Sequence, residues 1–231
     1  MSITSTASGR IKRRKPGRPA SEPDFDSRDA LLRSAHQMLS ESRGLPVPLS
    51  AICARAGVDV AMVHYHFENR LGLMTALFER LCAAWAPDME SLLALDVGPR
   101  KKLEIHIRQI IRNYRRYPYT TRVMTELVTS NKPALAKRMS SNFFKPLVQF
   151  YERLLEQGVA AGEFRPIDPV FFFFSVVGLC EFLFVAQPML AVGLNFGAVN
   201  EEMEAMFIAH TTALVLDGVL PVGVRQSNRE Y

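Results

Sequence analysis

The side chains of this 231-residue sequence that could perform acid–base or metal chemistry are too scattered to form an active site. Among the five histidines, only His64 and His66 lie close together, and side chains two residues apart on a helix point about 200° away from each other. The three cysteines, Cys53, Cys82 and Cys180, form no CxxC pair, which argues against a zinc site and a disulfide framework and fits a reducing compartment. The sequence contains no GxSxG, HExxH or glycine-rich phosphate loop. We therefore expect neither an enzyme nor a bound metal or cofactor.

Positive charge is concentrated at the N-terminus. The formal net charge is +5, but residues 1–20 contain six Lys or Arg and no acid, so the rest of the chain is close to neutral. Residues 1–26 are rich in Ser, Thr, Gly and Pro, which predicts a disordered basic arm. The segment 16–19 (PGRP) resembles the core of an AT-hook, a motif thin enough for a narrow minor groove. The arm residues expected to contact DNA are Lys12, Arg13, Arg14, Lys15 and Arg18. The alternative is a solvated tail without a partner.

The rest of the chain has the pattern of an all-α protein. Apolar residues recur at helical spacing from Arg28 onward, and no alternating strand of useful length is present. About nine helices are expected, the last two beginning after the N-caps Asp168 and Asn200. The second-last helix is expected to end near Ala186, before a proline, and Pro146 is expected to kink the seventh helix because it lacks a backbone donor.

Two short expected helices have the dimensions of a helix-turn-helix. They cover residues 49–56 and 60–67 and meet at Gly57, whose backbone can adopt a left-handed turn that is costly for other residues. Asp59 is expected to cap the second helix by accepting from its free amides. That second helix could enter a DNA major groove, although a glycine between two helices is often only a corner.

The surrounding residues sharpen this interpretation. The motifs Arg28-x-x-Leu31-Leu32-x-x-Ala35, Ile52-Cys53-x-x-Ala56-Gly57-Val58 and Tyr65-His66-Phe67-x-x-Arg70-x-x-Leu73 follow one another in order. They resemble the N-terminal domain of the TetR family of bacterial transcriptional repressors. The resemblance implies a three-helix helix-turn-helix head at residues 27–72 and a larger helical domain for ligand binding and dimerisation at residues 73–231. It also implies a homodimer that a small-molecule effector releases from a palindromic operator in double-stranded DNA.

The resemblance assigns DNA contacts to the second helix of the pair. Hydrogen-bonded base readout is expected from His64, which stands where the family usually has a tyrosine, and from Tyr65. The apolar start of the helix, which can only contact a thymine methyl, is Val60, Ala61 and Met62. Phosphates are expected to be held by Arg55, His66 and Arg70. Residues 21–70 contain seven acids and five Lys or Arg, so the arm is expected to supply much of the affinity.

The C-terminal region provides material for a dimer interface and a ligand pocket. The helix beginning at Pro169 is apolar nearly all round, and together with the last helix it is expected to form an antiparallel four-helix seam. The expected seam residues are Phe172, Val176, Leu183, Met203, Phe207 and Leu214. The expected pocket residues, each of which could instead be plain core, are Trp85, Met89, Ile111, Tyr114, Met124, Phe143, Leu147, Glu181 and Phe184. The carboxylate of Glu181 is costly to bury, so it is a ligand contact, the partner of an arginine, or solvent-facing.

A second resemblance concerns the same region. The segment 166–169 (PIDP), followed twelve residues later by Glu181, and the segment 85–87 (WAP) are similar to the branch that includes the uracil-responsive regulator of pyrimidine use. That branch has a polar residue near this position, and the acid found here departs from it.

Two other functions remain alternatives. Residues 169–199 carry few charges and could attach a helical protein to a membrane, where a span needs about 20 apolar residues. Glu181 interrupts this run after eleven residues, and an acid near mid-span costs about 2.5–3.5 kcal/mol. The other alternative is non-specific, architectural DNA binding. The balance favours a cytoplasmic regulator that makes no use of a membrane.

Overall fold

The computed structural model describes residues 26–42, 46–193, 197 and 199–221, and all regular secondary structure in these ranges is helical. The helices are α1 (Ser27–Glu41), α2 (Leu49–Ala56), α3 (Ala61–Phe67), α4 (Arg70–Ala94), α5 (Pro99–Arg116), α6 (Thr120–Val128), α7 (Pro133–Met139), the π-helical segment η1 (Ser140–Phe144), α8 (Lys145–Ala160), α9 (Pro169–Gly193) and α10 (Glu201–Val219). Because α7, η1 and α8 follow one another without a break, the described residues form nine continuous helical stretches. The all-α prediction is confirmed.

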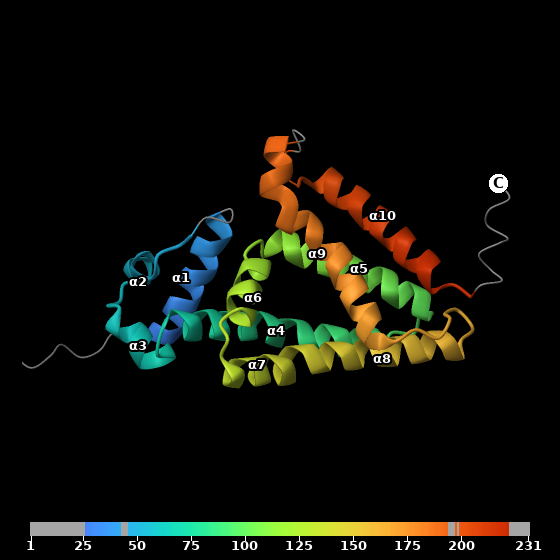
Figure 1. Cartoon of the computed structure of the whole chain (residues 1–231), viewed down its shortest axis with the longest axis horizontal. Coiled ribbons are helices and arrows are strands. Elements are labelled where there is room, and N and C mark those ends of the chain that lie inside the picture. Colours follow the sequence, from blue (N-terminus) through green and yellow to red (C-terminus); the bar gives the residue numbers. More distant parts are fainter. Residues whose placement is uncertain (1–25, 43–45, 194–196, 198, 222–231) are drawn as a thin grey trace, which may run out of the picture.

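The helices are arranged around α4, the long helix that runs through the molecule (Figure 1). The three helices of the head, α1, α2 and α3, gather at its N-terminal end, and α5, α8, α9 and α10 lie toward its other end. Helix α6 packs against the N-terminal half of α4, between these two groups. This position places α6 beside the head as well as beside the larger helical body.

Buried apolar side chains form two clusters, and α4 contributes to both. The first cluster joins the head to the N-terminal half of α4 and to α6, through residues such as Leu31, Ile52, Leu77 and Val123. The second cluster gathers the end of α4 with α5, α8, α9 and α10, and its members include Leu92, Ile107, Tyr151, Val176 and Leu216. The core of the head thus extends past residue 72, where the domain boundary was expected. That boundary stays a prediction.

Polar caps fix the beginnings of the last two helices. The carboxylate of Asp168 accepts from the backbone amides of Val170 and Phe171 at 2.9 and 3.0 Å, and the side-chain oxygen of Asn200 accepts from Met203 N at 2.8 Å. Both expected caps are confirmed. The expected end of α9 near Ala186 is wrong, because the helix continues to Gly193. A proline removes only one backbone donor, and the turns on either side of position 188 remain helical.

The distortion expected at Pro146 lies one turn earlier. Residues Ser140–Phe144 form the π-helical segment η1, and Pro146 sits in the first turn of α8. A π-turn inserts one extra residue into the helix, which loosens the turn into which the proline ring would otherwise crowd. The wider turn also places Phe143 and Phe144 against both apolar clusters.

Candidate functional site

The turn between α2 and α3 has the expected geometry. Gly57 is left-handed, with φ +69° and ψ +29°, and its amide donates to the carbonyl of Ala54 at 3.2 Å. Asp59 Oδ1 accepts from the amide of Ala61 at 2.7 Å, as the sequence predicted, although α3 begins at Ala61 and not at Val60. A Cβ atom at position 57 would have no neighbour within 4 Å, so the turn needs glycine for its backbone angles and not for space.

The junction between α3 and α4 is also tight. Glu68, the C-cap of α3, has a positive φ of +67°, and the side chain of Asn69 caps α4 by accepting from Gly72 N at 3.1 Å. A Cβ at Gly72 would lie 1.9 Å from the carbonyl oxygen of Phe67. This close approach of the two backbones restricts the angle at which α4 follows α3.

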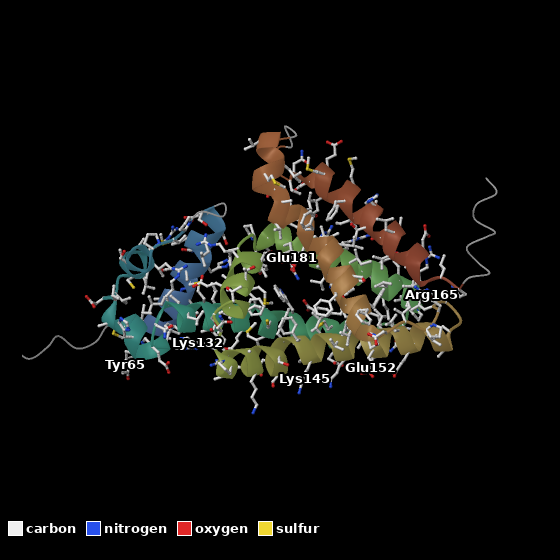
Figure 2. The ribbon with its side chains drawn as sticks, in the orientation of Figure 1. Tyr65, Lys132, Lys145, Glu152, Arg165 and Glu181 are labelled. Atoms are coloured by element: carbon white, nitrogen blue, oxygen red, sulfur yellow. The ribbon has the colours of Figure 1, made fainter. Side chains whose placement is uncertain are left out.

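Helix α3 turns one face inward and presents the other to solvent. Val63 and Phe67 are buried in the first cluster, whereas Ala61, His64 and Tyr65 are exposed. The side chain of Tyr65 is 80% exposed and lies at the outer end of the head (Figure 2). The expected presentation of His64 and Tyr65 is therefore possible in this structure, while their contact with DNA stays a prediction.

The apolar start of α3 is less available than expected. Val60 and Met62 are half-buried and pack against the first apolar cluster, to which the head and the start of α4 contribute. Of the three expected apolar contacts, only Ala61 is exposed. This corrects the view that all three residues face outward.

Two histidines of α3 have internal partners. His64 Nδ1 lies 2.8 Å from the carbonyl oxygen of Glu68, and His66 Nε2 lies 2.7 Å from the hydroxyl of Ser27. A carbonyl can only accept, so Nδ1 of His64 carries the hydrogen of this bond, and Nε2 is directed away from it. His66 is half-buried and connects α3 to the N-terminus of α1.

The arginines expected at phosphates also have partners within the chain. Arg55 pairs with both carboxylate oxygens of Glu41, at 2.6 and 3.0 Å, and this pair lowers the pKa of Glu41. Arg70 Nη1 donates to the carbonyl of Val47 at 2.8 Å, and its Nε lies 3.4 Å from Glu126 Oε1 on α6. A phosphate would have to compete with these groups. The expected arm contacts Lys12, Arg13, Arg14, Lys15 and Arg18 lie outside the described residues.

A cavity of about 360 Å³ lies among α4, α5, α6, η1, α8 and α9. Seven of the nine expected pocket residues line it, namely Trp85, Met89, Tyr114, Met124, Phe143, Leu147 and Glu181. The other two do not: Ile111 is fully buried in the second cluster, and Phe184 stacks on the ring of Tyr114 with the centroids 5.8 Å apart. Their positions correct the predicted walls. Whether the cavity holds a ligand stays a prediction.

Polar residues of α5 that were not expected also line the cavity. His106, Gln109 and Asn113 occupy one face of this helix at intervals of three and four residues. This spacing of polar groups beside an apolar stripe was the signal in the sequence that could have identified them. His106 Nε2 lies 3.0 Å from the hydroxyl of Tyr151, and burial lowers the pKa of His106 to about 3, so its ring is neutral.

The charged groups of the cavity are acidic. Glu181, in the middle of α9, lies where this helix passes α5 (Figure 2), and Asp88 is the other charged residue of the lining. Burial, and then the neighbouring Glu181 carboxylate, raise the pKa of Tyr114, which therefore keeps its hydroxyl proton. Burial raises the pKa of Cys82, which also lines the cavity, to about 12, so it is a thiol.

Helices α9 and α10 carry many exposed apolar side chains. They are Val170, Phe171, Phe174, Leu179, Phe182, Val185, Met189 and Val192 on α9, and Met206 and Leu214 on α10. Of the expected seam residues, Leu214 belongs to this set, and Leu183, Met203 and Phe207 are half-buried. Phe172 and Val176 are buried inside the protomer's own second cluster, which corrects their assignment to a surface. We call the ten exposed residues the α9–α10 stripe.

The same helix has the composition of a membrane span. By length and composition Pro169–Gln187 could cross a bilayer, a property that the core helices of soluble proteins share. Glu181 lies inside this segment and lines the cavity.

The comparisons with known proteins agree with this architecture. The family model described as "Tetracyclin repressor-like, C-terminal domain" matches residues 96–224. The nucleoid occlusion factor SlmA of Aliivibrio fischeri is 25% identical over 157 residues, which cover 67% of this chain and 80% of that protein.

Solved structures show the same fold. A regulatory protein of the TetR family from Rhodococcus RHA1 superposes with a TM-score of 0.66 at 14% identity, over 84% of this chain and 97% of that one. The transcriptional regulator FadR from Bacillus subtilis, in complex with stearoyl-CoA, superposes with a TM-score of 0.64 at 17% identity, over 83% and 98% of the two chains. At these identities the likeness concerns the fold alone.

A helix-turn-helix head joined to a helical body that encloses a ligand-sized cavity defines a DNA-binding transcription regulator. The family model covers more than half of the chain. The chain belongs to the TetR family. Regulators of this family bind DNA, form dimers, respond to small molecules and are generally not enzymes.

Proposed function

We propose that this protein is a dimeric, cytoplasmic repressor that binds a palindromic operator and leaves it when a small molecule fills the cavity. The observation that carries this proposal is the position of α6, which forms part of the cavity wall and also touches the head. The proposal joins the exposed face of α3, the α9–α10 stripe and the cavity in one mechanism.

The link through α6 consists of short, specific contacts. Helix α6 lines the cavity with Thr120, Thr121 and Met124. On its other side, Glu126 pairs with Arg70 at the start of α4, and the Tyr119 hydroxyl lies 2.7 Å from His36 Nδ1 on α1. A ligand that binds more tightly to one position of α6 than to another would favour that position and the arrangement of the head that goes with it. The equilibrium would change by the difference between the two binding free energies.

DNA recognition is assigned to the exposed face of α3. Tyr65 can contact a base or a phosphate, and His64 Nε2, which takes no part in the bond to Glu68, can meet a base edge in the major groove. The described part of the head offers few unpaired cations, since Arg55 and Arg70 are held by Glu41 and Glu126. The basic arm is therefore proposed to neutralise phosphates and to enter the adjacent minor groove.

Dimerisation is assigned to the α9–α10 stripe. Ten exposed large apolar side chains on two helices are more than a soluble monomer usually presents to water, and two antiparallel helices from each copy would bury both stripes in a four-helix seam. A dyad at this seam presents two equivalent α3 helices, which requires two inverted half-sites in the operator. If a second copy covers the α9–α10 stripe, the apolar composition of α9 is explained without placing this helix in a membrane.

The effector itself does not follow from the structural neighbours. FadR of B. subtilis binds stearoyl-CoA, an anion. The cavity of this chain contains two carboxylates and, within the described residues, neither Lys nor Arg. An acyl-CoA is therefore a poor candidate here.

An electrophoretic shift assay with the DNA upstream of the protein's own gene tests the proposal. We expect a discrete complex that a scrambled duplex of the same length does not compete away. Deletion of residues 1–20 should weaken this complex and flatten its dependence on salt. Equal affinity for every duplex would instead identify a non-specific architectural protein, and a need for detergent to release the protein from membranes would support the membrane alternative.

A further inference from the structure

The cavity has an uneven balance of charge. Its lining contains the carboxylates of Glu181 and Asp88 and, among the residues that the structure describes, no lysine or arginine. Its one histidine, His106, is neutral because burial lowers its pKa. Within a low-dielectric space such an excess of negative charge favours a cation over an anion of the same shape.

Aromatic rings make up much of the remaining wall. They come from four helical segments, α4, α5, η1 and α9, and comprise Phe78, Trp85, Tyr114, Phe143, Phe144, Phe173 and Phe174. Phe174 is 61% exposed and belongs to the α9–α10 stripe as well as to this lining. The face of an aromatic ring is negative, so a cation is attracted to it in addition to the apolar contact that the ring provides. A wall of rings next to carboxylates suits an apolar molecule with one positive charge.

Glu181 is the carboxylate that can pair with such a charge. It is half-buried, and no ion pair to it occurs within the described residues, where its close polar neighbour is the protonated hydroxyl of Tyr114. A hydroxyl satisfies only part of the hydrogen-bonding capacity of a carboxylate, and removing a carboxylate from water is costly unless a cation accompanies it. Asp88 is exposed and lies at the solvent side of the lining.

We infer that the cavity binds a lipophilic cation, an aromatic or apolar body whose single positive charge lies against Glu181 between the aromatic walls. This inference rests on the proposed function only in naming that cation as the class of effector. Gln109 and Asn113 on α5 provide amide groups for any further polar substituent.

Two ions of nearly the same shape and opposite charge test the inference directly. Tetraphenylphosphonium and tetraphenylborate are titrated in sodium buffer into the full-length protein, and binding is followed through the fluorescence of Trp85, the single tryptophan, which lines the cavity. We expect the cation to bind at least about tenfold more tightly than the anion.

Matched variants identify the carboxylate. Glu181→Gln should weaken tetraphenylphosphonium binding at least about tenfold, because it removes the charge and keeps the shape. Asp88→Asn should weaken it by only about threefold, because this acid is exposed and screened. Glu152→Gln, which removes the same charge from the outer side of α8 (Figure 2), should leave binding unchanged.

Several results would overturn the inference. They are equal or tighter binding of tetraphenylborate, binding of neither ion, and equal effects of Glu181→Gln and Glu152→Gln in variants that keep the thermal midpoint of the parent. The shift assay separates this outcome from failure of the proposed function. If tetraphenylphosphonium binds through Glu181 but leaves the affinity for DNA unchanged, the cation site stands and the regulatory role of the cavity is wrong.

Discussion

Arg70 Nε lies 3.4 Å from Glu126 Oε1, and this contact ties the first turn of α4 to α6. The same guanidinium donates through Nη1 to the carbonyl of Val47, which precedes α2. One side chain thus connects the entrance of the helix-turn-helix, the helix that follows it and a wall of the cavity. Both charged side chains are about one-third exposed, so the pair is suited to being broken and remade with little loss of stability.

Glu126→Gln tests this connection. The expected loss in unfolding free energy is at most about 1 kcal/mol, because the pair is partly exposed. Binding of tetraphenylphosphonium in the cavity should stay within about twofold, since Glu126 does not line it, but the effect of the ion on DNA affinity should decrease. Titrations of the ion by fluorescence, and of DNA with and without the ion, measure both quantities. An unchanged response of DNA affinity would mean that the link runs elsewhere.

Tyr65→Ala tests the exposed face of α3. The ring is 80% exposed and, among the residues that the structure describes, its one ring contact is with His66 at 4.9 Å between centroids, so its removal should barely change the thermal midpoint. The affinity for the operator should fall about tenfold, as expected for one lost contact of 1–3 kcal/mol. Val159→Ala, an exposed residue on α8, is the control and should change neither quantity. Retained affinity in Tyr65→Ala would show that this face does not read DNA.

The two glycines of the head should respond differently to alanine. Gly57→Ala has free space for its Cβ but a positive φ, so we expect a loss of about 1–2 kcal/mol and a head that still binds DNA. Gly72→Ala places its Cβ against the backbone carbonyl of Phe67, and neither helix can move without disturbing the junction. We expect a loss of about 3 kcal/mol or more and impaired DNA binding. Urea unfolding of both variants measures the two losses in unfolding free energy. A smaller loss for Gly72→Ala than for Gly57→Ala would contradict the close packing at Gly72.

Phe182→Glu tests the α9–α10 stripe. Phe182 is 67% exposed in the protomer, so the charge can be tolerated by a single copy but not inside a seam between two. The dimer should dissociate at least about a hundredfold more readily, as measured by sedimentation or light scattering over a dilution series. Val159→Glu places the same charge at an exposed position of α8, outside the stripe, and should leave the dimer intact. Phe172→Glu, at a buried position, should unfold the protein rather than release a folded monomer.

His106 gives the protein an acid-sensitive stability. Its pKa is about 3 in the folded chain and about 6.5 in the unfolded chain, so between these values the unfolded chain binds a proton that the folded chain excludes. The free energy of unfolding therefore falls as the pH falls below about 6.5, by about 1.4 kcal/mol between roughly pH 7.5 and 5.5. His106→Gln keeps a polar group near Tyr151 and should lack this part of the decrease. Urea unfolding at the two pH values compares the chains, and parallel decreases would exclude His106 as the cause.

The local parts of this structure were predictable from the sequence. Gly57, Asp168 and Asn200 act through neighbours only a few residues away, and each has the role that its residue type and place in the pattern predicted. The helical spacing of apolar residues predicted the helices, and with the TetR resemblance it led to seven of the residues that line the cavity. These inferences depend on short-range rules that a single sequence contains.

The parts that could not be predicted depend on long-range packing. Helix α9 is apolar on every side, so its sequence does not indicate which side faces the core. The exposed residues include Phe171 and Phe182, whereas the expected Phe172 and Val176 are buried. The engagement of Arg70 by Glu126 joins residues 56 positions apart, which no local pattern indicates. The half-burial of Val60 and Met62 follows from the packing of this segment against the first cluster, which the turn sequence alone does not give.

Because α4 contributes to both apolar clusters, the chain cannot be divided at the end of the head into fragments that fold on their own. A fragment that stopped at residue 72 would leave out Leu73, Met74, Leu77 and Phe78, whose side chains complete the interior beneath α1 and α2. Such a fragment would expose the underside of its own helices to water and would be prone to aggregate. The DNA-reading end is therefore not an exchangeable module, and hybrid regulators made from this chain would need their junction beyond Leu81, with α6 carried along.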